Sequence, residues 1–555
     1  KRQYQVSVSN GNEKMKYFLS AGYLDEKGIL EGTYFKRYSF RANIDNQIRS
    51  WLNVSANISY SDNIGNTGII SGTGANRGGV VLSVINTPTY APIWDPEKPN
   101  QYNKNFYGVN IMNPMENLAR QKNNKNKENR LIASGAATIS FLPNLKLKSS
   151  IALDRRNGVS TTFLDPISTT DGRNSFGTAS DNRNMNTVLV FDNILTYNTN
   201  IKKHGIDVMA GSSYTKSDYT NSWINGSHFR DDKIQTLNAA NKISWDGTGT
   251  GASQWAISSY FARVSYNYDS KYMLTMNMRA DGSSKLHPDH RWGIFPSFSA
   301  AWRISSEKFM KDITWIDDLK LRGGWGQTGN ANIGGYAWGV AMSRMPSALG
   351  AGYRPANIAN PAIKWETQEQ WNAGIDLNML NNRLNLVVDA YIKTSKDMLM
   401  SMQLPSYMGT QGNGSSALAA PKGNFGEIQN KGIEIEVTGR PFVGEFEWES
   451  SFQISFNRNK LKALSGTENA QLVGYGQWSD VVSVSEIGQP LYNFYGYVVE
   501  GVYRDYDDIM NSPTPDHFPS DGVFNKSNTV WVGDLKYKDV NGDGKICLLY
   551  TSPSP

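Results

Sequence analysis

The chain has little cysteine, no long apolar run and no strong excess of charge. Its 555 residues contain a single cysteine, Cys547, which leaves no basis for a disulfide framework or a cysteine-based metal site. The longest apolar runs, such as 80–85, are far shorter than the roughly 20 residues that a membrane-spanning helix needs. The formal net charge of +6 is spread along the chain, which argues against a nucleic-acid-binding surface. These absences disfavour disulfide-rich, helical-membrane and nucleic-acid-binding classes.

Apolar and polar residues alternate one by one along most strand-like stretches. In 52–61, Leu52 and Val54 share one face while Asn53 lies on the other, and 446–457 repeats the pattern. Side chains in a strand point to opposite faces with period two, so each stretch has one apolar and one polar face. Such stretches run to about 10–12 residues, which suits a tilted crossing of a bilayer better than the 5–6 residues usual in soluble sheets.

Short turns rich in Asn, Asp, Gly and Pro alternate with long irregular stretches. The long stretches are expected at 62–129, 155–186, 214–253, 330–367, 395–430 and 458–489. Bacterial outer-membrane barrels have this alternation, with short periplasmic turns and long extracellular loops. We therefore predict an all-β fold, a transmembrane antiparallel β-barrel with about 17 strands in this sequence. Because single-chain bacterial barrels have even strand numbers, we expect further strands beyond it.

Both ends of the sequence look cut. The chain begins within a strand-like stretch, without an initiator methionine or a signal-peptide pattern. Residues 547–555, CLLYTSPSP, are unlike the preceding sequence and resemble a translated sequencing adapter. We therefore expect a barrel domain at 1–546, incomplete at both ends, and a non-native tail at 547–555.

Several sequence blocks resemble the SusC/RagA group of TonB-dependent outer-membrane transporters. They are YLDEKG at 23–28, KRYSFR at 36–41, RADGSSK at 279–285, FPS at 295–297, AAWR at 300–303, LKLR at 319–322, GQTGN at 326–330, WET at 365–367, NFGEI at 424–428, NKG at 430–432 and DVNGDG at 539–544. Their order and spacing are also similar to those of the family. Together they span most of residues 1–546.

The resemblance implies a barrel of roughly 22 strands whose lumen is closed by an N-terminal plug. It also implies a SusD-like surface lipoprotein as partner, and energy coupling to TonB–ExbB–ExbD through a region that, like the plug, is absent from this sequence. The expected activity is not enzymatic. It is active import of oligosaccharides or peptides across the outer membrane of a Gram-negative bacterium, within outer-membrane lipid. Two alternatives stay open: a passive porin, and a secreted all-β glycan-binding protein or adhesin.

Residues 539–544 carry the only cofactor hypothesis. Asp539, Asn541 and Asp543 occupy positions 1, 3 and 5 of a calcium-loop pattern, and Gly544 at position 6 permits the sharp turn. Position 12, where a bidentate glutamate belongs, falls at Tyr550 in the expected non-native tail. The alternative is a plain turn rich in Asp and Asn.

Candidate ligand-binding residues are aromatic rings in the long stretches and one charged pair in a strand. Flat rings with polar atoms can stack on sugars or pack against a lipoprotein, although they also anchor their own loops. The candidates are Trp94, Tyr107, Trp223, Trp338, Tyr475 and Trp478. Arg279 and Asp281 are expected in the lumen wall near substrate or plug, or else as a structural ion pair. His287 and His290 are too few to predict a metal site.

Overall fold

The computed structural model describes most of the chain. The described residues are 1–66, 79–103, 113–245, 247–347, 350–402, 404, 406–409, 417–464, 471–476, 481–515, 530–540, 542, 544–546 and 550–552. They form two compact units, 1–266 with 277–285, and 267–276 with 286–555. Each unit is built mainly from long antiparallel strands.

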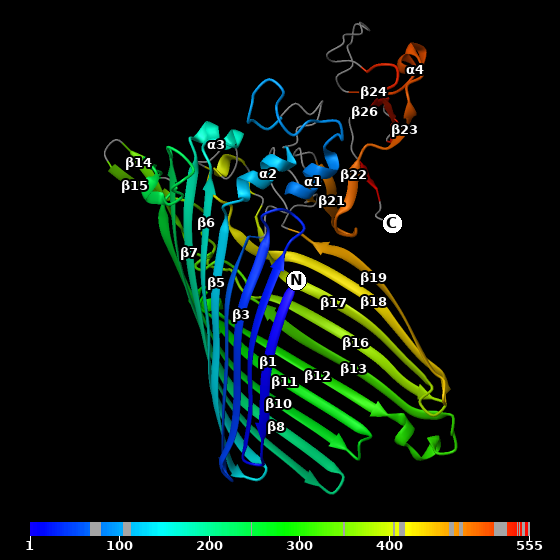
Figure 1. Ribbon diagram of the computed structural model, residues 1–555. Helices are drawn as coiled ribbons and strands as arrows, with labels where there is room; N and C mark the ends of the chain where they lie inside the picture. Colours follow the sequence, from blue (N-terminus) through cyan, green and yellow to red (C-terminus); the bar gives the residue numbers. More distant parts are fainter. Residues whose placement is uncertain are drawn as a thin grey trace. The chain divides into compact units, whose positions relative to one another are not determined.

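The first unit is a meander in which each strand from β1 to β8 pairs with the next along the chain (Figure 1). The strands are β1 (Arg2–Gly11), β2 (Met15–Lys27), β3 (Tyr34–Arg49), β4 (Leu52–Asn66), β5 (Lys125–Leu142), β6 (Leu145–Leu164), β7 (Thr178–Ile201), β8 (His204–Ser227), β9 (Lys242–Ile243) and β10 (Gly249–Tyr268). Its helical segments are α1 (Gly79–Asn86), α2 (Pro114–Gln121), α3 (Thr170–Ser175) and η2 (Leu237–Ala239). Strand β11 (Tyr272–Ser283) contributes residues to both units.

The second unit contains another antiparallel meander and several small sheets. The meander consists of β12 (Trp292–Arg303), β13 (Ile316–Asn330), β16 (Glu366–Met379), β17 (Leu384–Ser401), β18 (Lys422–Val443) and β19 (Glu447–Ala463). The small sheets contain β14 (Met342–Ser347), β15 (Gly350–Pro355), β20 (Gln471–Tyr475), β21 (Val481–Glu486), β22 (Asn493–Gly496), β23 (Val499–Val502), β24 (Thr514–Pro515), β25 (Leu535–Tyr537), β26 (Lys545–Ile546) and β27 (Tyr550–Ser552). The helical segments are η3 (Pro288–His290), η4 (Ile304–Ser306), η5 (Lys308–Met310), η6 (Ser406–Met408) and α4 (Tyr506–Met510).

The long strands have the two-faced character that the sequence predicts. In β19, Phe452 and Phe456 are 62% and 60% exposed, so no protein covers this apolar face. They lie opposite Val437 and Ile433 of β18, whereas Gln453 lies opposite Glu436 on the other face. An apolar face with no protein cover is what a membrane-embedded sheet presents to lipid. No helix among the described residues is long and apolar enough to span a membrane.

Many strands extend well beyond their predicted ends. The predicted irregular stretch 214–253 contains the last part of β8 and the start of β10, and 155–186 likewise contains the ends of β6 and β7. The reason is that these strand ends are polar on both faces, as in Asn182–Arg183–Asn184, so the alternation that reveals a strand disappears. Backbone pairing nevertheless continues to Thr178 and Ser227, the last pair of β7 and β8.

Protein-covered apolar cores are small and lie where strand ends meet the loops. One core in the second unit contains Leu286, Phe295, Ala331, Ile333, Ile363 and Trp365. A second, in the first unit, contains Phe163, Ala179 and Phe229. The long strands are thus held by backbone ladders, while small cores fix the loops that connect them.

Candidate functional site

Four long connections of the first unit share one end of its sheet. Because consecutive strands are antiparallel, the connections that follow β2, β4, β6 and β8 all lie at the same end, and the short turns lie at the other. These connections are 28–33, 67–124, 165–177 and 228–248. Residues that are far apart in the sequence are thereby brought together.

Two short helices fix the geometry of this end. Helix α2 begins at Asn113, whose side chain accepts a hydrogen bond from the Met115 N–H (3.0 Å), with Pro114 in the first turn. Glu116 of α2 is only 2% exposed, and its Oε1 accepts the Thr170 N–H at 2.5 Å, at the first residue of α3. The carboxylate thus satisfies a backbone donor that the start of α3 leaves without an intrahelical partner.

Further polar contacts tie α2 to its surroundings. Arg120 of α2 forms a 2.7 Å ion pair with Asp171 of α3. Asn117, which is fully buried, donates to the Ser83 hydroxyl of α1 at 3.1 Å. The carbonyl of Gln121 accepts the side-chain N–H of Asn66 at 2.8 Å, which anchors α2 to the end of β4. Buried hydrogen-bonded groups of this kind specify one loop arrangement.

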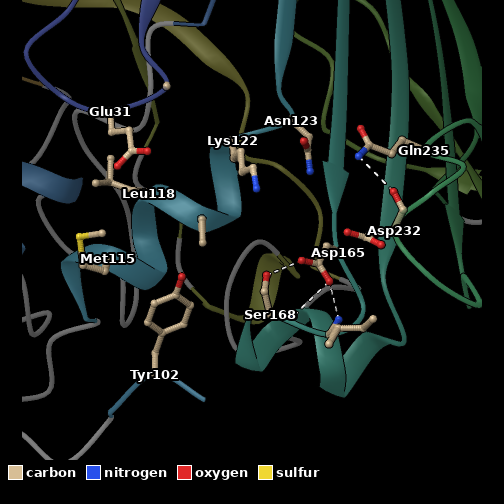
Figure 2. A pocket seen from close by; sticks show the side chains of 13 residues that line it. Glu31, Tyr102, Met115, Leu118, Lys122, Asn123, Asp165, Ser168, Asp232 and Gln235 are labelled. Carbon is tan, nitrogen blue, oxygen red and sulfur yellow. Dashed lines mark hydrogen bonds between the residues drawn. The ribbon is translucent and has the colours of Figure 1, made fainter. Parts of the chain in front are cut away.

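The four connections enclose a cavity of about 550 Å³ (Figure 2). It is lined by Glu31, Gly32, Tyr102, Met115, Leu118, Ala119, Lys122, Asn123, Asp165, Ile167, Ser168, Asp232 and Gln235. Tyr102, Met115 and Leu118 stand on one side of the view, with Asp232 and Gln235 on the other. A concave surface with an apolar part and several convergent polar groups can hold a small ligand or one residue of a larger one.

The lining is anionic overall. It carries three carboxylates, from Glu31, Asp165 and Asp232, against the single ammonium of Lys122. Asp165 is held in place locally, because its Oδ1 accepts the N–H groups of Ile167 (2.6 Å) and Ser168 (3.1 Å). The cavity therefore suits polar or cationic groups better than anions.

Tyr102 lines the cavity and also contacts Trp94, one of the aromatic residues predicted to bind ligand. Its ring stacks on Trp94 with the centroids 4.6 Å apart, and the two residues also form a β-bridge. Burial raises the pKa of the Tyr102 phenol, and the nearby charges of Glu116, Asp165 and Glu31 raise it further. Trp94 itself is 53% exposed, so it presents a ring to solvent beside the cavity.

The other predicted aromatic residues do not gather at one place. Trp223 lies on β8 opposite Asn182, rather than in a loop, and Trp338 packs against the loop core of the second unit, 4.9 Å from the ring of His287. Tyr475 ends β20 and is 65% exposed. Tyr107 and Trp478 lie outside the described residues. Among the described candidates, only Trp94 adjoins the cavity.

Arg279 and Asp281 contact each other on β11. The Arg279 Nε lies 2.8 and 2.9 Å from the two carboxylate oxygens of Asp281, which is 8% exposed. The guanidinium also donates to the Ser259 hydroxyl at 2.9 Å and lies over the Phe261 ring. This pair is a well-satisfied local contact within the first unit, and both charges are already engaged.

The predicted calcium loop lies only partly within the described residues. The Asp539 carboxylate accepts the N–H groups of Gly542 and Gly544, each at 2.7 Å, while Asn541 and Asp543 lie outside the described residues. The calcium site therefore stays a prediction. His287 lies 3.4 Å from the Asp289 carboxylate, and the described part of the chain holds no group of three or more His, Cys, Asp or Glu residues suited to a metal ion.

The sequence did not single out most of the residues that build the cavity. Glu116, Lys122 and Asp165 are isolated polar residues in long connections, and nothing in their spacing indicates that they meet. One signal was available, because Asn113 followed by Pro114 is a typical helix start. It would have predicted α2, but not the contact between Glu116 and α3.

Comparison with known proteins identifies the fold and the family. Residues 67–541 match the family described as "TonB dependent receptor-like, beta-barrel". TonB-dependent receptor P39 of Formosa agariphila is 30% identical over 98% of this chain and 50% of its own length. TonB-dependent receptor SusC of Bacteroides thetaiotaomicron is 28% identical over 97% of this chain and 54% of its own length. A structure of the RagAB peptide transporter has a TM-score of 0.77 at 24% identity, covering 90% of this chain and 55% of its own.

These matches define the chain as a transmembrane antiparallel β-barrel protein of the outer membrane of Gram-negative bacteria. It belongs to the TonB-dependent receptor-like β-barrel family, whose members are receptors and transporters rather than enzymes. The predicted fold class and the resemblance to SusC/RagA transporters are thereby confirmed. The chain spans about half the length of the curated relatives that it matches.

Proposed function

We propose that this chain forms the barrel of a TonB-dependent importer that carries oligosaccharides or peptides across the outer membrane. The observation that carries the proposal is the family match over residues 67–541, together with the similarity to relatives named as TonB-dependent receptors. One such relative is SusC, and a solved structure of the same fold is described as a peptide transporter. Both substrate classes are too large for ordinary diffusion pores, which is why their uptake needs an energy-coupled transporter.

The cavity among the four connections is the proposed contact for substrate or for a SusD-like lipoprotein. Its polar and apolar lining suits hydroxyl, amide and cationic groups, and the Trp94 ring stands beside it for stacking. The remaining aromatic candidates, Trp223, Trp338 and Tyr475, are proposed as secondary contacts. Energy would come from TonB–ExbB–ExbD, and calcium at the Asp539 loop would act as a structural ion.

Uptake measurements in the native bacterium test the proposal. Deletion of the gene should abolish uptake of a labelled oligosaccharide pool or of a labelled peptide pool, and the pool affected names the substrate class. A protonophore should stop the same uptake, because energised import needs the proton-motive force. Uptake that continues in the protonophore would contradict this mechanism and favour a passive porin. Chelation of calcium, compared with Asp539→Asn, tests the ion separately.

A further inference from the structure

A groove crosses the outward face of the first unit, away from the cavity described above. It has a volume of about 610 Å³ and runs over strands β6, β7, β8 and β10. Its lining residues are Asn157, Gly158, Val159, Arg183, Asn184, Met185, Thr220, Asn221, Ser222, Thr250, Gly251 and Ala252. Strands β6, β7 and β8 lie side by side (Figure 1), and β8 also pairs with β10. Because its lining spans all four strands, the groove runs across them rather than along one.

The register shows on which face the groove lies. One wall contains Asn157, Met185 and Thr220, which are direct cross-strand neighbours, and the other contains Val159, Arg183 and Ser222. Between these rows lies a row that begins with Gly158. A Cβ placed on Gly158 would meet the Asn184 side chain at 2.8 Å, so that side chain points to the opposite face. Backbone therefore forms the floor of the groove.

The same face carries the apolar band of the barrel. Continuing along the strands with period two, it presents Ile151, Leu189 and Phe191, which are 52%, 37% and 43% exposed. Leu153 of this band lies four residues from Asn157 of the groove wall, which is about 13 Å along the strand. The groove lies toward the long connections, which are extracellular in barrels of this class. It therefore sits at the level of the outer-leaflet headgroups.

Basic residues dominate this part of the outward face. On the ends of β5 to β8 nearest the long connections it carries five cations and two carboxylates: Lys125, Lys127, Arg155, Arg183 and Lys216 against Asp181 and Asp218. Arg183 pairs with Asp181 at 2.9 Å, and Lys216 pairs with Asp218 at 3.1 Å.

Three of the five cations, Lys125, Lys127 and Arg155, have no carboxylate partner among the described residues. Lys127 and Arg155 are the two that flank the groove, and the Arg155 guanidinium donates a hydrogen bond to the Met185 sulfur at 3.3 Å. Both side chains are exposed. Lys127 lies opposite Val159, which belongs to one wall of the groove. Arg155 lies two residues from Asn157, which belongs to the other wall.

We propose that this groove binds the phosphate-bearing headgroup of an outer-leaflet lipid. Arginine and lysine supply the donors that phosphate oxygens accept, and the apolar band immediately beneath would take the acyl chains of the same molecule. Charge complementarity and continuity with the lipid-facing band favour a lipid over a soluble anion.

Lipid retention by the receptor, expressed from its complete gene and purified in mild detergent, tests the proposal. Native mass spectrometry with added lipopolysaccharide of the native bacterium should show bound lipid, and Lys127→Gln/Arg155→Gln should reduce binding by about tenfold or more. Neither substitution breaks an ion pair. Lys202→Gln removes an exposed cation from the turn between β7 and β8, at the opposite end, and should bind like the unchanged receptor.

Two further probes identify the group that is recognised. Lipopolysaccharide from which phosphate has been removed enzymatically should bind the unchanged receptor as weakly as the intact lipid binds the double variant. Equal binding of the dephosphorylated lipid would overturn the proposal, because it would show acyl contact alone. Displacement of the lipid by millimolar inorganic phosphate would also overturn it, in favour of a small-anion site. The proposal would also be overturned if the double variant kept the lipid but lost a co-purifying lipoprotein, because the groove would then bind that protein.

Discussion

Arg322 of β13 reaches across an entire strand to form a two-point ion pair with Asp389 of β17. The two guanidinium nitrogens Nη1 and Nη2 lie 2.6 Å from Oδ1 and Oδ2 of the carboxylate, respectively. Gly374 of β16 stands directly between them in the register, opposite both residues. A Cβ at Gly374 would lie 2.6 Å from the Asp389 Oδ1 and 2.7 Å from the Arg322 Cζ. The missing side chain is therefore what lets the pair form.

Gly374→Ala should destabilise the receptor by about 1–2 kcal/mol, because the bidentate pair must move apart while both partners stay largely buried. Arg322 and Asp389 are 29% and 27% exposed, so water only partly compensates for the loss. The free energy of unfolding in urea, measured in lipid vesicles, checks this. Gly439→Ala on β18 is the matched control, since a Cβ there meets no atom within 4 Å. Equal effects of the two substitutions would contradict the role assigned to Gly374.

The two faces of β19 should respond differently to a positive charge. Ile454→Arg places the charge on the face that meets lipid and should cost about 2–4 kcal/mol near the bilayer midplane. Gln453→Arg places it on the other face, opposite Glu436, and should cost much less. Folding titrations of both variants into vesicles measure the difference. Equal losses on both faces would be incompatible with the orientation of β18 and β19.

Glu116 should hold α3 in place. Glu116→Ala removes the acceptor of the Thr170 N–H and leaves a partly buried donor unpaired, which costs about 1 kcal/mol locally. Hydrogen exchange in residues 167–177 should then become faster, while exchange in the β6–β7 ladder stays unchanged. Glu116→Gln keeps an oxygen acceptor at the same position and should restore most of the protection. If glutamine behaves like alanine, the hydrogen bond is not what secures α3.

The cavity should loosen at alkaline pH through Tyr102. The pKa of its phenol is raised above the usual value near 10 by burial and by neighbouring carboxylates, so the folded loops favour the neutral ring. The resulting stability is complete below pH 10 and is lost as the pH rises through the folded-state pKa. Fluorescence of the stacked Trp94 should report this step. Tyr102→Phe should abolish it, whereas Tyr353→Phe, at a 69% exposed tyrosine, should leave it intact.

Sequence alone predicted the strands that lie in the membrane, but not their full length. In 52–61 the apolar face must meet lipid, so selection for membrane insertion imposes the alternation that a reader can detect. Beyond that band, around Asn184 and Asn221, both faces are polar, and pairing no longer requires any pattern. Trp223 was assigned to a loop for this reason, although it lies on β8.

The cavity was less accessible to prediction for a topological reason. Its lining comes from four connections between Glu31 and Gln235, and only the antiparallel pairing of the intervening strands brings them together. The sequence correctly predicts that Trp94 lies in a loop. Nothing in the sequence distinguishes Tyr102, the residue on which Trp94 stacks, from several other tyrosines in the long stretches. Charge, burial and helix capping at Glu116 appear only once the chain is folded.

Surface labelling should fix the direction in which the barrel crosses the membrane. Only one cysteine, Cys547, occurs in the sequence, so single cysteines introduced elsewhere can be followed once Cys547 is replaced by serine. Glu31→Cys and Ile167→Cys lie in the long connections beside the cavity, and we expect both to react with an impermeant maleimide on intact cells. Asn144→Cys lies in the two-residue turn between β5 and β6 and should react only after the outer membrane is permeabilised. Labelling of Asn144→Cys on intact cells, with Glu31→Cys protected, would reverse the topology and would place the outward groove at the inner leaflet, where no lipopolysaccharide could reach it.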